Sequence, residues 1–197
     1  MSAAPKPFLS PQEYLARERE AETKSEYYDG EVFAMAGGSQ EHSLIAANVI
    51  AELGPQLRES PCEVHTSDLR VQVGGAGPYA YPDVTVVCGE AEFADEERDN
   101  LLNPTVIVEV LSPTTEAWDR GGKFERYQQR ASLQEYVLIA PDRPRAERYA
   151  RQGDEEWLLT VTTGLAGRVS LSSIECELRL AEVYRKVTFP EDAGRRR

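Results

Sequence analysis

The chain has 197 residues, 34 of them acidic and 22 basic, so its formal net charge at pH 7 is −12. This length corresponds to one domain, at roughly 100–200 residues per domain, and is sufficient to fold without disulfides or metals. The acidity excludes proteins that coat nucleic acids or anionic membranes, because both classes need a basic surface. It does not exclude an enzyme with a small, locally basic site.

The three cysteines are odd in number and have no CxxC spacing, so the sequence predicts neither a zinc site nor a disulfide framework. Cys88 ends an apolar run and is expected to be a buried, reduced thiol. The first eight residues lack the apolar core of a signal peptide. The longest apolar runs, of about five residues, are far shorter than the roughly 20 that span a membrane. We therefore expect a cytoplasmic protein without a membrane segment.

Capping and turn signals predict the first elements. Ser10 and Glu13 form a capping box around a helix that ends near Glu20. Asp29-Gly30 between two β-prone pieces predicts a hairpin. A long helix is expected to follow, as far as Glu59. Side chains at helical spacing form one face of that helix: His42, Ile45, Val49 and Leu53.

Runs of apolar and β-branched residues predict four strands in the middle of the chain. They cover Val64–Val73, Asp83–Cys88, Thr105–Leu111 and Glu135–Ala140. The third is almost continuously apolar, which is typical of a strand buried on both faces. The acidic stretch Glu90–Asp99 is interpreted as a solvated linker, and a helix is predicted over Gly121–Ala131.

The last part of the chain contains a second hairpin signal, Gly153-Asp154. Two strands are predicted on either side of this turn, Ala146–Gln152 and Glu155–Thr163. Two short strands or sheet edges follow, Val169–Leu171 and Cys176–Leu180. The last predicted element is a helix, Ala181–Val187. Residues 190–197 are expected to be a frayed tail. Together the elements predict an α/β fold, in which residues 1–189 form a single domain with a mixed central β-sheet flanked by helices.

One charged residue interrupts the most apolar strand. Alternation places Glu109 on the same face as Ile107 and Leu111. An unpaired carboxylate in a buried strand costs on the order of several kcal/mol. Glu109 should therefore be paired with an arginine or lysine, protonated, or bound to a metal.

Asp83 begins a second apolar strand, and Lys123 lies on the helix that follows the strand of Glu109. Two carboxylates on neighbouring strands form a hard oxygen site suited to Mg²⁺, which takes one or two carboxylates and keeps several waters. Lys123 and Tyr127 are four residues apart and share a helix face. Each residue also has an ordinary interpretation, Asp83 as a turn residue and Lys123 as an exposed lysine.

Pro82-Asp83, followed by a strand that contains Glu109, resembles the PD-(D/E)XK nuclease superfamily. A wider set of motifs resembles the Uma-two family, whose bacterial members are described as restriction endonucleases. The motifs that carry this resemblance are Asp29–Glu31, Tyr81–Val84, Asn103–Thr115, Asp119–Lys123 and Leu133–Leu138. The resemblance extends over residues 10–187 and is strongest over 81–138.

The resemblance implies a restriction-endonuclease-like fold and metal-dependent hydrolysis of phosphodiester bonds in nucleic acid, with DNA favoured. Asp83 and Glu109 would then hold Mg²⁺ or Mn²⁺, the carbonyl of Val110 would add an oxygen ligand, and Lys123 would be catalytic. The superfamily pattern has a lysine where this chain has Leu111, whereas the Uma-type lysine comes from the next helix. The resemblance also implies a homodimer, because cutting both strands calls for two sites.

Four residues are weaker candidates for the same site: Glu31, His42, Asp68 and Tyr127. Their alternatives include an exposed hairpin glutamate, a satisfied core histidine and a core tyrosine. The main alternative function is a catalytically inactive nuclease fold that binds nucleic acid or regulates a partner. Other hydrolases are disfavoured because the chain has no Gly-x-Ser-x-Gly elbow, P-loop or Rossmann fingerprint.

Residues 116–151 carry eight basic and six acidic side chains, so this segment is net positive by two within an acidic chain. The basic excess adjoins the predicted site. We expect it to guide phosphates there, with an affinity that falls steeply as salt is added.

Overall fold

The computed structural model describes residues 8–74 and 77–189. Its largest sheet has the strand order β11-β10-β9-β8-β6-β3. Strands β8 and β9 run parallel, and the other neighbouring pairs are antiparallel. The bounds are β3 Cys62–Thr66, β6 Val84–Cys88, β8 Val106–Val110, β9 Glu135–Ile139, β10 Arg145–Arg151 and β11 Trp157–Thr163.

A smaller sheet has the order β2-β1-β5-β4-β7, and β12 pairs with β13. These strands are β1 Ser25–Tyr28, β2 Glu31–Ala34, β4 Arg70–Gln72, β5 Tyr79–Ala80, β7 Asn100–Leu101, β12 Arg168–Leu171 and β13 Cys176–Arg179. The helices are α1 Pro11–Glu20, α2 Gln40–Leu57, α3 Glu116–Trp118, the π-helical turn η1 Asp119–Lys123, α4 Phe124–Tyr127, the 3₁₀ turn η2 Ser172–Ile174 and α5 Leu180–Val183.

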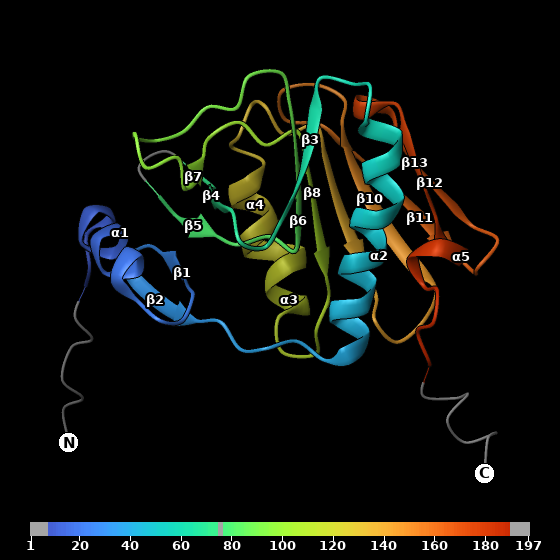
Figure 1. Cartoon of the computed structure of the whole chain (residues 1–197), viewed down its shortest axis with the longest axis horizontal. Coiled ribbons are helices and arrows are strands. Elements are labelled where there is room, and N and C mark those ends of the chain that lie inside the picture. Colours follow the sequence, from blue (N-terminus) through green and yellow to red (C-terminus); the bar gives the residue numbers. More distant parts are fainter. Residues whose placement is uncertain (1–7, 75–76, 190–197) are drawn as a thin grey trace, which may run out of the picture.

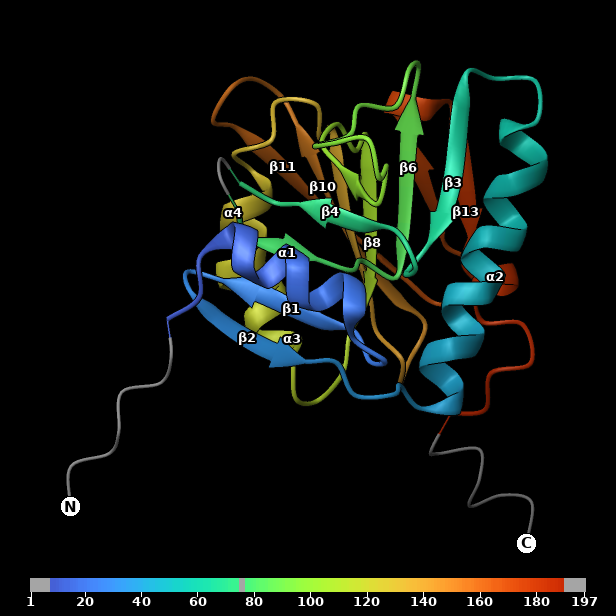
Figure 2. The same ribbon diagram turned by 60° about the vertical axis from the view of Figure 1, so that its left-hand side comes forward.

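The central sheet is covered on both faces (Figure 1). On one face, Val106, Val108 and Val110 of β8 pack in a cluster with α2, β13 and α5. On the other face, Ile107 and Leu111 pack with residues of α4, β1 and β4. The smaller sheet and α1 lie beyond that second face (Figure 2). This arrangement confirms a mixed α/β fold, and the alternation of β8 directs Glu109 toward the second face.

Most predicted elements are confirmed with small changes of length. Ser10 caps α1 in a capping box with Glu13, and Asp29-Gly30 joins β1 to β2. The predicted face of α2 is buried except at its first member, His42, which is half-buried. Strand β8 is buried at every residue, as expected for an apolar run covered on both faces.

Three boundaries differ from the prediction. Val64–Val73 is not one strand, because a turn, closed by the Leu69 N–H donating to the Thr66 carbonyl at 3.2 Å, divides it into β3 and β4. The helix predicted over Gly121–Ala131 begins earlier, at α3, and ends with α4. The last helix, α5, is shorter than predicted. The predicted tail 190–197 lies outside the described residues.

The prediction of a reduced thiol at Cys88 is wrong. Cys62 and Cys88 form a disulfide, because the antiparallel register of β3 and β6 places them directly opposite each other. Twenty-six positions separate the two residues in sequence, so their pairing depends on a strand register that no local pattern reveals. Cys176 is buried and free.

The acidic stretch Glu90–Asp99 is more than a solvated linker. Asp95 and Asp99 accept from Arg19 of α1 at 2.6 and 2.9 Å, and Asp99 also pairs with the buried Arg70 at 2.7 Å. The stretch therefore ties α1 to β4 through ion pairs. Among the described residues, no helix is long and apolar enough to cross a membrane.

Candidate active site

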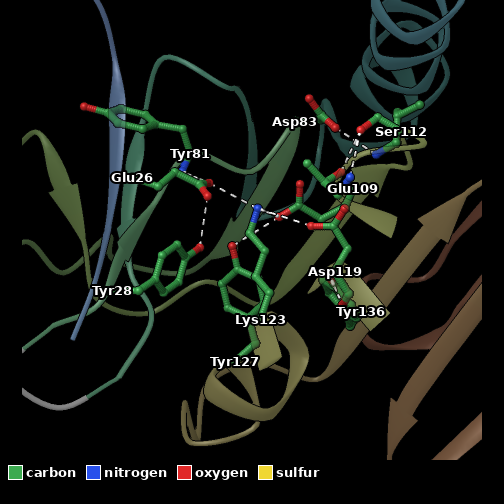
Figure 3. A network of polar contacts seen from close by, with 12 residues as sticks. Glu26, Tyr28, Tyr81, Asp83, Glu109, Ser112, Asp119, Lys123, Tyr127 and Tyr136 are labelled. Atoms are coloured by element: carbon green, nitrogen blue, oxygen red, sulfur yellow. Dashed lines mark hydrogen bonds and ion pairs between the residues drawn. The ribbon is translucent and has the colours of Figure 1, made fainter. Parts of the chain in front are cut away.

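A polar cluster lies on the second face of the central sheet, between β6, β8, η1 and β1 (Figure 3). The β6–β8 register pairs Val84 with Val108, so its continuation places Asp83 opposite Glu109. The Val110 N–H donates to Asp83 Oδ2 at 2.8 Å, which fixes the Asp83 carboxylate at the end of β8. The two predicted carboxylates are therefore held side by side by the sheet itself.

Lys123 lies at the centre of the cluster (Figure 3). Its Nζ is 2.8 Å from Glu109 Oε1, 3.1 Å from Glu26 Oε1 and 3.7 Å from Asp119 Oδ1. Lys123 and Glu109 are only 4% and 5% exposed, so these are buried ion pairs. The hydroxyl of Tyr127 donates to Glu109 Oε1 at 3.3 Å. The structure thus brings the predicted Asp83, Glu109 and Lys123 into one cluster.

The π-helical turn η1 delivers both Asp119 and Lys123 to this cluster. Both side chains are buried although they belong to a short turn. Gly122 permits the turn to pack closely, since a Cβ at this position would clash with the Trp118 ring. The hydroxyl of Tyr136 on β9 donates to the Asp119 carbonyl at 3.1 Å, which anchors the turn to the sheet.

Glu26 reaches the cluster from β1. Its Oε2 accepts from the Tyr28 hydroxyl at 3.1 Å and its Oε1 from the Tyr81 N–H at 3.2 Å. Glu26 is thereby held against Lys123 by both its own strand and the segment that precedes Asp83.

Burial is the main influence on the protonation of the cluster. It raises the pKa of Glu109 well above its ordinary value although Lys123 opposes the shift, and Asp119, Asp83 and Glu26 act in the same direction as burial. Burial likewise raises the pKa of Asp119. Burial works against the charged form of Lys123, but Glu109 and Glu26 overcome it and raise the lysine pKa. Glu109, Asp119 and Lys123 therefore hold their protons more tightly than the same groups in water.

His42, in the first turn of α2, also contacts the Asp83 carboxylate. Its Nε2 lies 3.3 Å from Asp83 Oδ2. The hydrogen bond with Asp83 raises the pKa of His42 against the effect of burial, with a further contribution from the Val110 carbonyl. The Asp83 carboxylate and the Val110 carbonyl, which the sequence predicted as metal ligands, therefore both favour the protonated form of His42.

A family model named Uma2 and described as "Putative restriction endonuclease" matches residues 11–182. The chain belongs to the Uma2 family. Two uncharacterized proteins of Synechocystis sp. are each 36% identical to it. The protein slr1290 aligns over 187 residues, which is 95% of this chain and 97% of that protein. The protein sll1609 aligns over 172 residues, which is 87% of this chain and 97% of that protein.

A solved structure supports the fold assignment. The crystal structure titled as a "putative nuclease belonging to DUF820" from Anabaena variabilis superimposes with a TM-score of 0.73. The match covers 91% of this chain and 99% of that one, at 19% identity. This Uma2 protein therefore has the fold of that protein, as the resemblance to nucleases predicted.

Two of the four weaker candidates lie outside the polar cluster. Asp68 is exposed and forms an ion pair with Lys24, and Glu31 is exposed on the edge strand β2. Sequence reasoning missed Glu26 and Asp119. The spacing of Asp119, four residues before Lys123, could have revealed it as a neighbour on one helix face. No local pattern could have revealed Glu26.

Most basic side chains of the segment 116–151 already have intramolecular partners. Five of its arginines pair with carboxylates: Arg120, Arg126, Arg143, Arg145 and Arg148. Arg130 and Arg151 donate to backbone carbonyls. The segment therefore offers fewer free cations to phosphates than its composition predicted.

The pair of His42 and Asp83 can be tested by NMR titration of the metal-free protein. We expect a His42 pKa above 6.5, and a lower value in Asp83→Asn. Because the folded pKa is raised, the stabilisation from this pair is fully present below the unfolded pKa and is lost as pH rises through the folded one. Asp68→Asn, at an exposed aspartate that pairs with Lys24, is the matched control and should leave the titration unchanged. A His42 pKa at or below 6.5 would contradict the pairing.

Proposed function

We propose that this Uma2 protein is a metal-dependent endonuclease that hydrolyses phosphodiester bonds in nucleic acid, with DNA as its main substrate. The observation that carries the proposal is the placement of Asp83 opposite Glu109, beside the buried Lys123. Two carboxylates and a lysine at one point are the groups that phosphodiester hydrolysis needs to hold a cation and offset phosphate charge. The family and the nuclease-like fold support this assignment.

The donor set fits Mg²⁺ or Mn²⁺. Asp83 and Glu109 offer carboxylate oxygens, and the Val110 carbonyl is a third hard donor at the end of the same strand. Within residues 8–74 and 77–189, no group of three or more His, Cys, Asp or Glu side chains is arranged to hold a metal. Mg²⁺ does not require such a group, because it binds through one or two carboxylates and keeps its waters. The surplus of buried carboxylates is the feature that favours a divalent cation.

A bound Mg²⁺ would supply an activated water and neutralise charge on the phosphate. The chain contributes a rigid set of groups around it. The Val110 N–H orients Asp83, and Tyr127 orients Glu109 through Oε1. Lys123 lies 2.8 Å from Glu109, so beside a metal held by that carboxylate its ammonium would offset phosphate charge or orient water.

A plasmid-nicking assay tests the proposal. The purified protein should nick supercoiled DNA with Mg²⁺ or Mn²⁺ and should stop when EDTA is added. Parallel reactions on single-stranded DNA and on RNA decide the substrate class, and binding should weaken steeply with salt. Binding of nucleic acid without cleavage in any metal would favour the inactive binding module instead. A binding constant that is insensitive to salt would argue for a substrate other than nucleic acid.

A further inference from the structure

The large apolar side chains that the described residues expose gather in two places. One group is carried by β2 and its neighbours. The other lies on β11 and the turn after it, where Leu158, Leu159, Val161 and Leu165 are 53%, 46%, 43% and 50% exposed. Strand β11 is an edge of the central sheet, with β10 on its inner side only. Its outer edge is therefore a long apolar strand without a partner among the described residues.

This edge lacks the features that normally protect a sheet from pairing. Exposed edges usually carry charges, prolines or bulges. Residues 157–167 contain no charged residue and no proline, although 28% of the chain is charged. The opposite edge, β3, is shorter and bears Glu63, whose side chain is 70% exposed. Of the two edges of the central sheet, β11 is therefore the one without these protective features.

The register defines which backbone groups of β11 face outward. The Gln152 N–H donates to the Glu156 carbonyl, and the Gly164 N–H donates to that of Pro144, both at 2.8 Å. Hydrogen-bonded pairs alternate along an antiparallel ladder, so even-numbered residues of β11 bond to β10. The N–H and C=O groups of the odd-numbered residues, from Trp157 to Thr163, point to the open edge.

We propose that a second copy of this chain pairs with β11 in antiparallel orientation and joins two central sheets across a two-fold axis. If every residue of β11 pairs with a residue of the second copy, the two-fold axis passes through Thr160. This register pairs Trp157 with Thr163 and Leu159 with Val161, and these are the residues whose backbone groups face outward. Leu159 and Val161 share one face of the strand with Trp157. Their side chains would therefore form one apolar cluster from both copies.

The distribution of charge supports a second copy in this orientation. Two chains of net charge −12 repel each other, so they can approach closely only along a charge-free surface. Residues 154–156, just before β11, are all acidic. Antiparallel pairing across a two-fold axis places the two acidic segments at opposite ends of the shared ladder. Parallel pairing would place the two acidic segments side by side.

Light scattering after size exclusion, over a range of concentrations, tests the pairing in the full chain. We expect the wild type to show a dimer that dissociates on dilution, and Val161→Lys to be monomeric. The matched control is Val32→Lys, since Val32 is also 43% exposed and also lies on an edge strand. It should leave the dimer intact. A wild type that is monomeric at every concentration, or a dimer that survives Val161→Lys, overturns the proposal.

Cysteine cross-linking tests the register, with the folding of each variant checked by circular dichroism. Thr160 would face its own copy in a non-hydrogen-bonded pair, with Cα atoms about 4.5 Å apart. Thr160→Cys should therefore form a disulfide-linked dimer under mild oxidation. Thr163→Cys, on the same exposed strand, would face Trp157 and should remain largely monomeric under denaturing, non-reducing electrophoresis. Equal cross-linking of the two variants, or none with Thr160→Cys, overturns the register and the proposal with it.

Discussion

Asp83→Asn is expected to lower metal-dependent cleavage by about a hundredfold or more. Loss of a group that only supports a metal ligand costs roughly 10–100-fold in activity or affinity, so loss of a charged ligand should cost at least as much. Asparagine keeps an oxygen that can accept from the Val110 N–H, so the local backbone should not move. Calorimetry with Mg²⁺ or Mn²⁺ should show weaker binding by the same variant.

Glu109→Gln should have an effect of similar size on cleavage, because Glu109 supplies the second carboxylate. Asp68→Asn is the matched control, since Asp68 is an exposed aspartate outside the cluster. It should nick plasmid at the wild-type rate. If Asp83→Asn bound the metal and cleaved DNA as well as Asp68→Asn does, the assignment of Asp83 as a ligand would be wrong.

The part of the site that the sequence predicts starts from the apolar run of β8. A strand of valine and isoleucine is predictable from composition, and a glutamate within it is anomalous enough to mark the site. Asp83 is a candidate because it begins a second apolar strand, and Lys123 because it lies on the next helix. Each of these signals is local in sequence, and the structure brings the three residues together.

The remaining parts of the site depend on tertiary contacts that sequence patterns do not encode. Glu26 reaches Lys123 from a strand that is 97 residues away in the chain. The disulfide follows from the register of β3 and β6. The arginines of the basic segment looked available for phosphates, but ion pairing within the protein uses several of them, for example Arg148 with the buried Glu135. Counting charges along a chain cannot separate a free cation from a paired one.

Lys123→Met is expected to destabilise the protein by about 3–5 kcal/mol, because removing one partner leaves uncompensated buried charge. Glu109, Glu26 and Asp119 would lose the only ammonium within 4 Å that the described residues provide. Urea unfolding at neutral pH measures the loss. Lys24→Met, which breaks the exposed pair with Asp68, is the control and should cost at most about 1 kcal/mol.

The pH dependence of Lys123→Met separates lost charge from lost packing. Burial raises the pKa of Glu109 above its ordinary 4.5, and without Lys123 this pKa should rise further. Stability linked to a raised carboxyl pKa is fully present below the unfolded value and is lost as pH rises through the folded value. The deficit of Lys123→Met should therefore shrink in acid and grow toward neutral pH, and adding Glu109→Gln should recover part of it. A deficit that is constant with pH and unchanged by Glu109→Gln would mean that Lys123 acts through packing rather than as the counter-ion of Glu109.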